Sequence, residues 1–342
     1  LGTLGTTNEI ITVKIPSGRY KVTSTITTYP QIKLVATGFV QIESYIANGT
    51  VIYLRYPAKT GLGCDYRGNP IHGNGHGIII KNMCYTGGSV TEDTSVFGGN
   101  NIAIELGTRE ADDSTFSDVR MVARYGIDDV IINGFRIGMK MNGISHFMGH
   151  YELVRIKLCD TCVQIGEYEG QNQAASIENF NFDSCLFERS NNVIKWVRNG
   201  VGLTFNNCSV DYIRDNFMLA TQSGARRIIF NNGHIEKIRN YMYFGNFTNT
   251  YGSINTLIQF NGVEIHLKYG QLFKSLGTKV LVSFDSCMWS RDDYYDNEAT
   301  AHRFHAADRK LGGNNIYFDK IGITALYNYG LPVTGVTAVT NH

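Results

Sequence analysis

The chain has 342 residues and is 43% hydrophobic, so it can bury a long core, and its 37 Gly against 5 Pro point to many turns. A formal net charge of +1 provides no general basic field, so no nucleic-acid partner is predicted. No apolar run approaches the roughly 18 residues of a membrane helix, and no GxGxxG, P-loop or GxSxG motif occurs. Neither membrane insertion nor a cofactor is predicted.

Residues 1–56 alternate apolar and polar side chains. Ile11, Val13 and Ile15 precede a turn at residues 16–18, and similar alternation resumes after it. Such alternation is typical of strands with one face against a core. We expect this region to form the N-terminal coils of a solenoid built from strands.

Residues 57–114 are rich in Gly and Asn, as in the stretch from His72 to Gly77. This composition predicts an irregular excursion and loop region. His72 and His76 are spaced as metal ligands can be, but Gly residues separate them and no carboxylate stands nearby in the sequence. We therefore predict a flexible loop and no metal site.

A repeat with a nearly constant period dominates residues 115–290, the predicted central coils. An aromatic residue, an Asx residue and a small residue recur five times, and the Phe positions are 23, 25, 30 and 24 residues apart. The copies begin at Phe182, Phe205, Phe230, Phe260 and Phe284. Tyr151 fits the same register upstream of these copies. A repeat architecture follows from this period.

Aligning the copies on the Phe produces columns of apolar residues. Two residues before the Phe stand Phe180, Leu203, Ile228, Ile258 and Val282. Five residues after it stand Phe187, Val210, Ile235, Ile265 and Trp289. Twelve residues after it stand Ile194, Phe217, Met242 and Leu272. Polar residues mostly separate the columns, as period-two strands require. The apolar runs are short, β-branched or aromatic, and broken by Asn and Gly, which favours strands over a helical solenoid.

About three short strands per coil, each parallel to its equivalent in the next coil, predict an all-β fold, a parallel β-helix. The Asx column after the Phe is interpreted as a structural corner, because Asx side chains bond turn backbones. Cys185, Cys208 and Cys287 share one column and are expected to be small buried residues in a protein made in a reducing compartment. Cys159 and Cys162 form a single CxxC, which does not predict zinc.

The last region, residues 291–342, is predicted to be a charged excursion followed by a terminal coil. Residues 291–313 combine acidic, basic and aromatic side chains, including Asp292, Tyr294 and His302. Such a segment is expected either to overhang a groove or to pack on a neighbouring subunit.

The segment Ile15-Pro16-Ser17-Gly18-Arg19-Tyr20-Lys21-Val22, followed by alternating strands and Asx-cornered coils, resembles the pectate-lyase-like right-handed β-helices of bacteriophage tailspike depolymerases. The resemblance covers most of the chain at the level of pattern. It implies a homotrimer at the virion tail, made in the bacterial cytoplasm, that binds and cleaves bacterial surface polysaccharide such as capsule or O-antigen. Catalytic positions vary in that group, so the resemblance implies none here.

The candidate catalytic residues are therefore those of the outward rows. The position six residues after the Phe reads Glu188, Asp211, Glu236, His266 and Ser290, and the position four after it includes His234 and Glu264. Adjacent coils lie about 4.8 Å apart, so neighbouring acids in this row approach closely and one pKa is expected to rise. We predict that Glu236 and Asp211 form a glycosidase pair, with Glu188 as the alternative partner and His234 or Arg189 orienting the sugar. The competing interpretation is that polar residues simply coat the outside of the coils.

A second chemistry remains open on the same face. A uronic-acid polysaccharide could be cleaved by β-elimination, with a base removing the proton next to the carboxyl group and cations stabilising the developing charge. The candidates for this reaction are Arg189, Tyr212, Arg214, His234, Lys237 and Arg239. Glu264 and His266 are further residues that are expected to contact sugar. A third possibility is a non-catalytic adhesin that binds glycan through Tyr241, Tyr243 and Phe273, which are alternatively trimer contacts.

Overall fold

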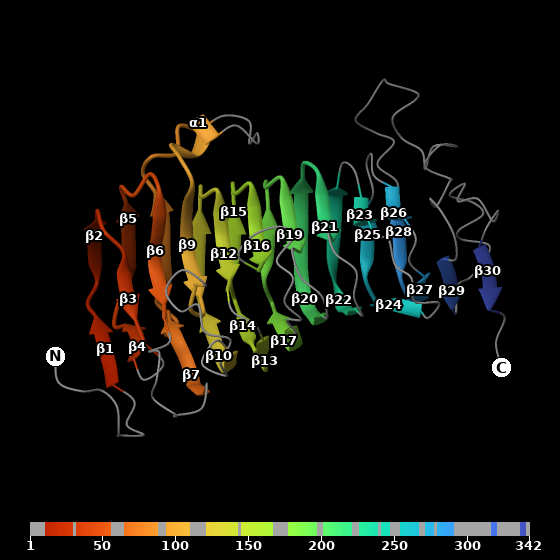
Figure 1. Ribbon diagram of the computed structural model, residues 1–342, viewed down its shortest axis with the longest axis horizontal. Coiled ribbons are helices and arrows are strands. Elements are labelled where there is room, and N and C mark those ends of the chain that lie inside the picture. Colours follow the sequence, from red (N-terminus) through yellow and green to blue (C-terminus); the bar gives the residue numbers. More distant parts are fainter. Residues whose placement is uncertain are drawn as a thin grey trace.

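Parallel strands stacked along one long axis make up the protein, with β1 (Ile11–Ile15) near one end of the stack and β30 (Val336–Val339) at the other (Figure 1). The computed structural model describes residues 11–29, 32–55, 65–87, 94–109, 121–142, 145–166, 177–196, 201–220, 226–238, 241–246, 254–266, 271–276, 279–290, 316–319 and 336–339. Within these ranges the one helix is α1 (Thr94–Phe97), and all strand pairings that define the sheets below are parallel.

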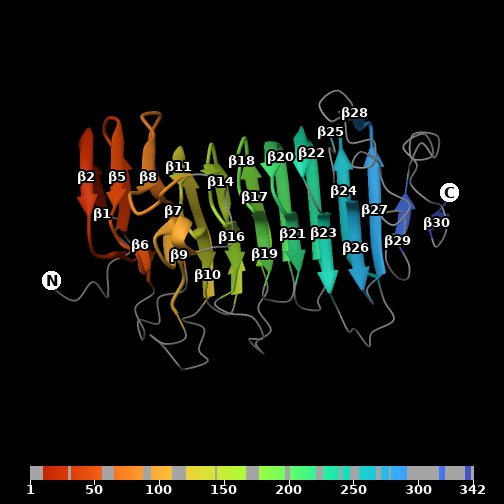
Figure 2. The same cartoon turned by 90° about the horizontal axis from the view of Figure 1, so that it is seen from above.

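Two sheets run along this axis, and the view from above shows their strands side by side in chain order (Figure 2). The 21-stranded sheet contains, besides β1 and β30, the strands β2 (Gly18–Val22), β4 (Ile32–Ala36), β5 (Val40–Ser44), β7 (Asp65–His72), β8 (Ile78–Asn82), β10 (Met121–Asp128), β11 (Val130–Asn133), β13 (Ser145–Phe147), β14 (His150–Glu152), β15 (Arg155–Lys157), β17 (Ile177–Asp183), β18 (Leu186–Glu188), β20 (Val201–Ile213), β22 (Arg226–Ile238), β24 (Ile254–Asn261), β25 (Glu264–His266), β27 (Lys279–Asp285), β28 (Met288–Ser290) and β29 (Ile316–Asp319). The nine-stranded sheet contains β3 (Ile26–Thr28), β6 (Gly49–Leu54), β9 (Asn101–Leu106), β12 (Ile137–Met141), β16 (Thr161–Ile165), β19 (Asn192–Trp196), β21 (Asn216–Ala220), β23 (Tyr241–Asn246) and β26 (Gln271–Leu276). The all-β class is confirmed, and the two long parallel sheets agree with the predicted β-helix.

The number of strands per coil differs along the stack. The segment from Ile177 to Trp196 forms β17, β18 and β19, whereas β20 runs unbroken for 13 residues and pairs with both β17 and β18. β22 repeats this long form. Bends that separate two strands in one coil are thus absorbed into a single strand in the next.

Stacked aromatic rings fill the centre of the core. The Phe that opens each repeat pairs with its equivalent in the next coil, and centroid separations of 4.8–4.9 Å with interplanar angles of 4–14° join Tyr151, Phe182, Phe205, Phe230 and Phe260. Phe187 and Phe217 meet the stack edge-on. Parallel in-register strands make this stacking obligatory, because equivalent residues of adjacent coils lie about 4.8 Å apart. The predicted register of Tyr151 is confirmed.

The Asx column forms a hydrogen-bonded ladder on the outside of the first corner. The Nδ2 group of Asn206 donates to Asp183, that of Asn231 to Asn206 and that of Asn261 to Asn231, at 2.6–2.9 Å. The residue after each Asx adopts a left-handed conformation, with φ between 52° and 56° at Ser184, Asn207, Asn232 and Ser286. The structural interpretation of this column is confirmed, and the turn itself belongs to the small residue that follows it. Cys185 and Cys208 are buried beside this corner as free thiols, while Cys287 is half-buried.

The column predicted twelve residues after the Phe is wrong at its first member, while the register of Phe217, Met242 and Leu272 is as predicted. Ile194 stands in register with Met218, not with Phe217, although both of these side chains are buried. The corner between the two sheets is one residue longer in the coil of β20 and β21, because Glu188 pairs with Asp211 while Asn192 pairs with Asn216. An alignment that assumes a fixed spacing after the Phe cannot detect a one-residue insertion at this corner.

The prediction of an irregular region at residues 57–114 is wrong for much of its length. β7, β8 and β9 belong to the sheets, and β8 pairs with β5 on one side and β11 on the other. The Gly-rich stretch is a tight turn between β7 and β8. A Cβ at Gly73 would lie 2.2 Å from the Asp129 carbonyl oxygen, so glycine allows the coils to approach there. His72 lies in β7, where it pairs with Asp128.

A buried carboxylate ties the first coils together. Glu105 is fully buried and accepts hydrogen bonds from Arg109, Thr50 and Asn142, with Lys140 Nζ 3.5 Å away. Burial alone would raise the pKa of Glu105. The hydrogen bonds from the Arg109 guanidinium and the charge of Lys140 outweigh it, so the pKa lies below its ordinary value.

This lowered pKa makes stability depend on pH. A carboxyl whose folded-state pKa lies below its unfolded value of 4.5 stabilises the fold above that value, and the contribution is lost as pH falls through the folded-state pKa. We expect Glu105→Gln to lower the free energy of unfolding near neutral pH by about 2 kcal/mol. Denaturant unfolding of both proteins between about pH 7 and about pH 3 checks this, because the difference should shrink toward the acid end. A difference independent of pH would contradict it.

Candidate active site

The predicted outward row of acids exists. Glu188 at the end of β18, Asp211 in β20 and Glu236 in β22 are successive partners across the sheet, and His266 of β25 follows in the same register. The apolar residue before each acid, Phe187, Val210 or Ile235, is buried, so alternation turns the acids outward. All three carboxylates are half-buried.

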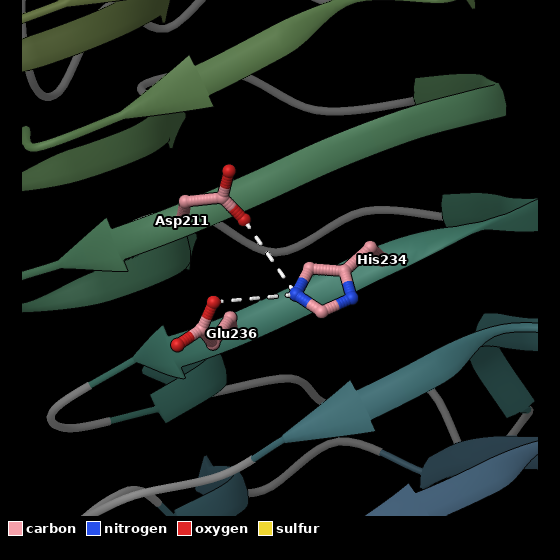
Figure 3. Close-up of side chains that lie close together, drawn as sticks. All are labelled: Asp211, His234 and Glu236. Atoms are coloured by element: carbon pink, nitrogen blue, oxygen red, sulfur yellow. Dashed lines mark hydrogen bonds and ion pairs between the residues drawn. The ribbon is translucent and has the colours of Figure 1, made fainter.

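His234 lies between carboxylates from three coils. Its Nε2 is 3.4 Å from Glu236 Oε2 and 3.9 Å from Asp211 Oδ1, and its Nδ1 is 3.4 Å from Glu264 Oε2. Figure 3 shows one nitrogen of the His234 ring facing both Asp211 and Glu236. One oxygen of Asp211 and one of Glu236 lie within 4.8 Å of each other. The structure therefore brings the two predicted catalytic acids together and places a predicted sugar-binding histidine beside both.

The two carboxylates have different environments. Burial raises the pKa of Asp211; hydrogen bonds from Ser209, at 3.0 and 3.1 Å, and the charge of His234 act against it, while Glu236 and Glu188 add repulsion. Burial also acts to raise the pKa of Glu236, but hydrogen bonds from Lys237 and His234 bring the net pKa below its ordinary value. Neighbouring carboxyl groups with pKa values pushed apart are suited to acid and base roles.

Lys237 fixes the charge of Glu236. Its ammonium contacts Glu236, donates to the Tyr212 hydroxyl at 2.9 Å and lies 4.4 Å from the Tyr212 ring centroid. The hydrogen bonds to Glu236 and Tyr212 raise the pKa of Lys237, which keeps it cationic. Arg189, Tyr212 and Lys237 all have positive φ, between 48° and 56°, and Arg189 and Tyr212 are exposed. These φ values mark a local bend at this position, although β20 and β22 continue through it to Ile213 and Ile238.

Glu188 has a partner that the sequence did not reveal. Arg155 of β15 donates to its Oε1 through Nε at 3.0 Å and through a terminal nitrogen at 2.6 Å. The repeat does place Arg155 on the outward face, because it stands four residues after Tyr151, in the same row as His234. This pairing makes Glu188 the less suitable catalytic partner.

Two further acids hold the turn between β7 and β8, since Asp128 pairs with His72 and Asp129 accepts the Gly77 N–H at 2.9 Å. The other predicted positions lie outside the described residues, namely Arg239, residues 291–313, and the side chains of Tyr241, Tyr243, His266 and Phe273.

Asp211, His234 and Glu236 are also the group of described residues with one nitrogen and two carboxylate oxygens close enough to share a metal ion. The Lys237 ammonium already contacts Glu236 and would repel a second cation there. This donor set therefore fits an acid–base site better than a metal site. Among the described residues, no helix has the length and apolar character required to span a bilayer.

Among solved structures, the chain is similar to ORF18 of Geobacillus virus E2, at 16% sequence identity and a TM-score of 0.35. The match covers 81% of this chain and 52% of that one, so it spans about half of the other protein's length. Neither a protein-family model nor a curated protein matches the sequence.

Proposed function

We propose that this chain is a polysaccharide depolymerase that hydrolyses glycosidic bonds with Asp211 as general acid and Glu236 as nucleophile. The observation that carries the proposal is a pair of outward carboxylates in adjacent coils, within 4.8 Å of each other, with pKa values displaced in opposite directions. Glycoside hydrolysis requires one carboxyl group that retains its proton beside another that is ionised.

The spacing favours retention of anomeric configuration. Retaining glycosidases hold their carboxyl groups about 5–5.5 Å apart and inverting enzymes about 6.5–9.5 Å apart. Asp211 would protonate the glycosidic oxygen while Glu236 attacks the anomeric carbon, forming a glycosyl ester and releasing the leaving sugar with its new hydroxyl group. Asp211 would then take a proton from water, whose oxygen displaces Glu236 and restores both groups.

The surrounding residues support these roles. Lys237 and His234 donate to Glu236 and so favour its ionised form before attack. Glu264 faces the other ring nitrogen of His234 and can fix the orientation of the ring. Tyr212 is 50% exposed beside the pair, where an aromatic ring can contact a sugar.

The biological setting is proposed from the sequence resemblance. An extended stack of parallel strands beginning with the Ile15–Val22 pattern supports a phage tailspike that acts on capsule or O-antigen as a homotrimer. Sedimentation equilibrium tests the trimer, and a monomer would contradict that part of the proposal.

A panel of purified capsular and O-antigen polysaccharides tests the activity. We expect new reducing ends without the absorbance of an unsaturated uronate, and an initial product with the anomeric configuration of the substrate, seen by NMR. No cleavage of any member would contradict the proposal, and an inverted product would remove Glu236 as nucleophile.

Polysaccharide lyase is the second candidate, because Lys237 and the Tyr212 hydroxyl form a cation–phenol pair beside the site. In that reaction Tyr212 would be the base and Lys237 the cation, since its raised pKa opposes a role as base. Reducing ends and unsaturated-uronate absorbance rising together would favour it. Glycan binding without either signal would favour an adhesin.

A further inference from the structure

A polar groove lies around the corner from the carboxylate pair. It is an open cavity of about 520 Å³ on the nine-stranded sheet, lined by residues of β16, β19 and β21 and by residues that directly precede β12, β16 and β21. Two of the lining residues are joined, since Asn216 of β21 donates to Asn192 of β19 at 3.2 Å. Arg214, one of the residues predicted for β-elimination, lines this groove, and none of the lining residues belongs to the Asp211, His234 and Glu236 cluster.

Positive charge is in excess in this groove. Arg136, Lys195 and Arg214 line it against two acids, Asp160 and Asp215. Asp160 is already engaged, with Arg136 Nε at 3.6 Å and an amide hydrogen bond from a neighbouring coil at 2.8 Å. The carboxylate row has the opposite balance, with Glu188, Asp211 and Glu236 in successive coils. The two surfaces therefore favour different parts of a ligand.

The groove begins close to the proposed cleavage position. Arg214 directly follows Ile213, the last residue of β20, and Asp211 lies in the same strand. Three residues of extended chain span at most about 11 Å, so the backbone at Asp211 and the backbone at Arg214 are no farther apart than that. The Arg214 N–H donates to Ser190 O at 2.9 Å, which fixes this corner against the preceding coil. One oligosaccharide can therefore reach both surfaces.

We propose that this groove is a binding subsite for a carboxylated sugar, and that the substrate is an acidic polysaccharide cut at a neutral residue near the acidic one. This inference rests on the proposed function for the cleavage step, while binding in the groove can be measured separately. A uronate placed at the acidic row would be repelled, whereas Lys195 and Arg214 can form charge-assisted hydrogen bonds with a carboxylate in the groove. The two surfaces together would fix which bond of the repeating unit is cleaved.

The test uses an acidic member of the polysaccharide panel and the same polymer after chemical reduction of its carboxyl groups. We expect Lys195→Gln and Arg214→Gln each to raise KM for the acidic polymer about tenfold with kcat unchanged, and to leave KM for the reduced polymer unchanged. Lys81→Gln, at an exposed lysine of β8 in the other sheet, is the matched control and should change neither constant.

Binding to the Asp211→Asn variant separates this inference from the proposed function. Tighter binding of the acidic polymer than of the reduced one, lost in Lys195→Gln, supports the groove even if no polymer is cleaved. Equal binding of the two polymers, binding unaffected by both groove variants, or cleavage of neutral polysaccharides alone overturns it. If Arg214→Gln fails to fold, as its circular dichroism would reveal, Lys195→Gln decides the question.

Discussion

Replacing Asp211 by Asn is expected to lower kcat on a cleaved polysaccharide by about 10²–10⁴-fold, because the leaving oxygen then receives no proton. Glu236→Gln should lower it at least as far, since an amide cannot form the glycosyl ester. The two losses differ in kind. A substrate with an activated aryl leaving group should restore much of the activity of the Asp211 variant, and added azide should restore that of Glu236→Ala as a glycosyl azide.

The pH profile gives a second signature of the same pair. Activity needs Glu236 ionised and Asp211 protonated, so kcat/KM should fall on the acid side as Glu236 gains a proton and on the alkaline side as Asp211 loses one. The lowered pKa of Glu236 moves the acid limit of activity to lower pH, and the raised pKa of Asp211 moves the alkaline limit to higher pH. Asp211→Asn should abolish the alkaline limb.

Glu152→Gln is the matched control for these variants. Glu152 is an exposed acid of β14 in the same sheet, outside the His234 cluster. Its variant should keep the wild-type rate and pH profile. Unchanged turnover in both Asp211→Asn and Glu236→Gln would remove the proposed pair.

Replacing Phe205 by Ala is expected to lower the free energy of unfolding by about 3–5 kcal/mol. Phe205 is 1% exposed and stacks between Phe182 and Phe230 at 4.9 and 4.8 Å, so its removal leaves a cavity and breaks two stacked and two edge-on ring contacts at once. Phe205→Leu keeps most of the volume and should lose about 1 kcal/mol, mainly through the lost stacking.

Denaturant and thermal unfolding measure these losses. Phe39→Ala is the control, because Phe39 is 51% exposed and its truncation should change stability by less than about 0.5 kcal/mol. A Phe205→Ala variant no less stable than the Phe39 variant would show that the aromatic column is not a major source of stability.

The sequence predicted the parts of the fold that repeat. Phe182, Phe205 and Phe230 stack as their spacing requires, and Asp211 meets Glu236 because both stand six residues after a Phe. A shared column position determines a contact wherever the strands are parallel and in register. The contact between these two carboxylates therefore follows from the sequence.

The sequence did not predict the features that differ from one coil to the next. The longer corner before Asn216 displaced the predicted column in the nine-stranded sheet, and it carries Arg214 into the groove. Arg155 was overlooked because its partner Glu188 belongs to a different row of the next coil. The pKa displacement of Asp211 depends on its burial and on Ser209 and His234 together, which residue spacing alone does not encode.

Besides the corner before Asn216, coil length varies where the chain returns from the nine-stranded sheet to the other sheet. Four connections lead from a strand of the nine-stranded sheet to the next strand of the other sheet, and they differ in length: residues 197–200, 221–225, 247–253 and 277–278. The Phe column nevertheless resumes in register after each of them. One residue inserted inside β20 would turn every following side chain of that strand to the opposite face. Descendants of this chain can therefore gain or lose residues at that step while inheriting the same core, so differences in length among them are expected to accumulate there.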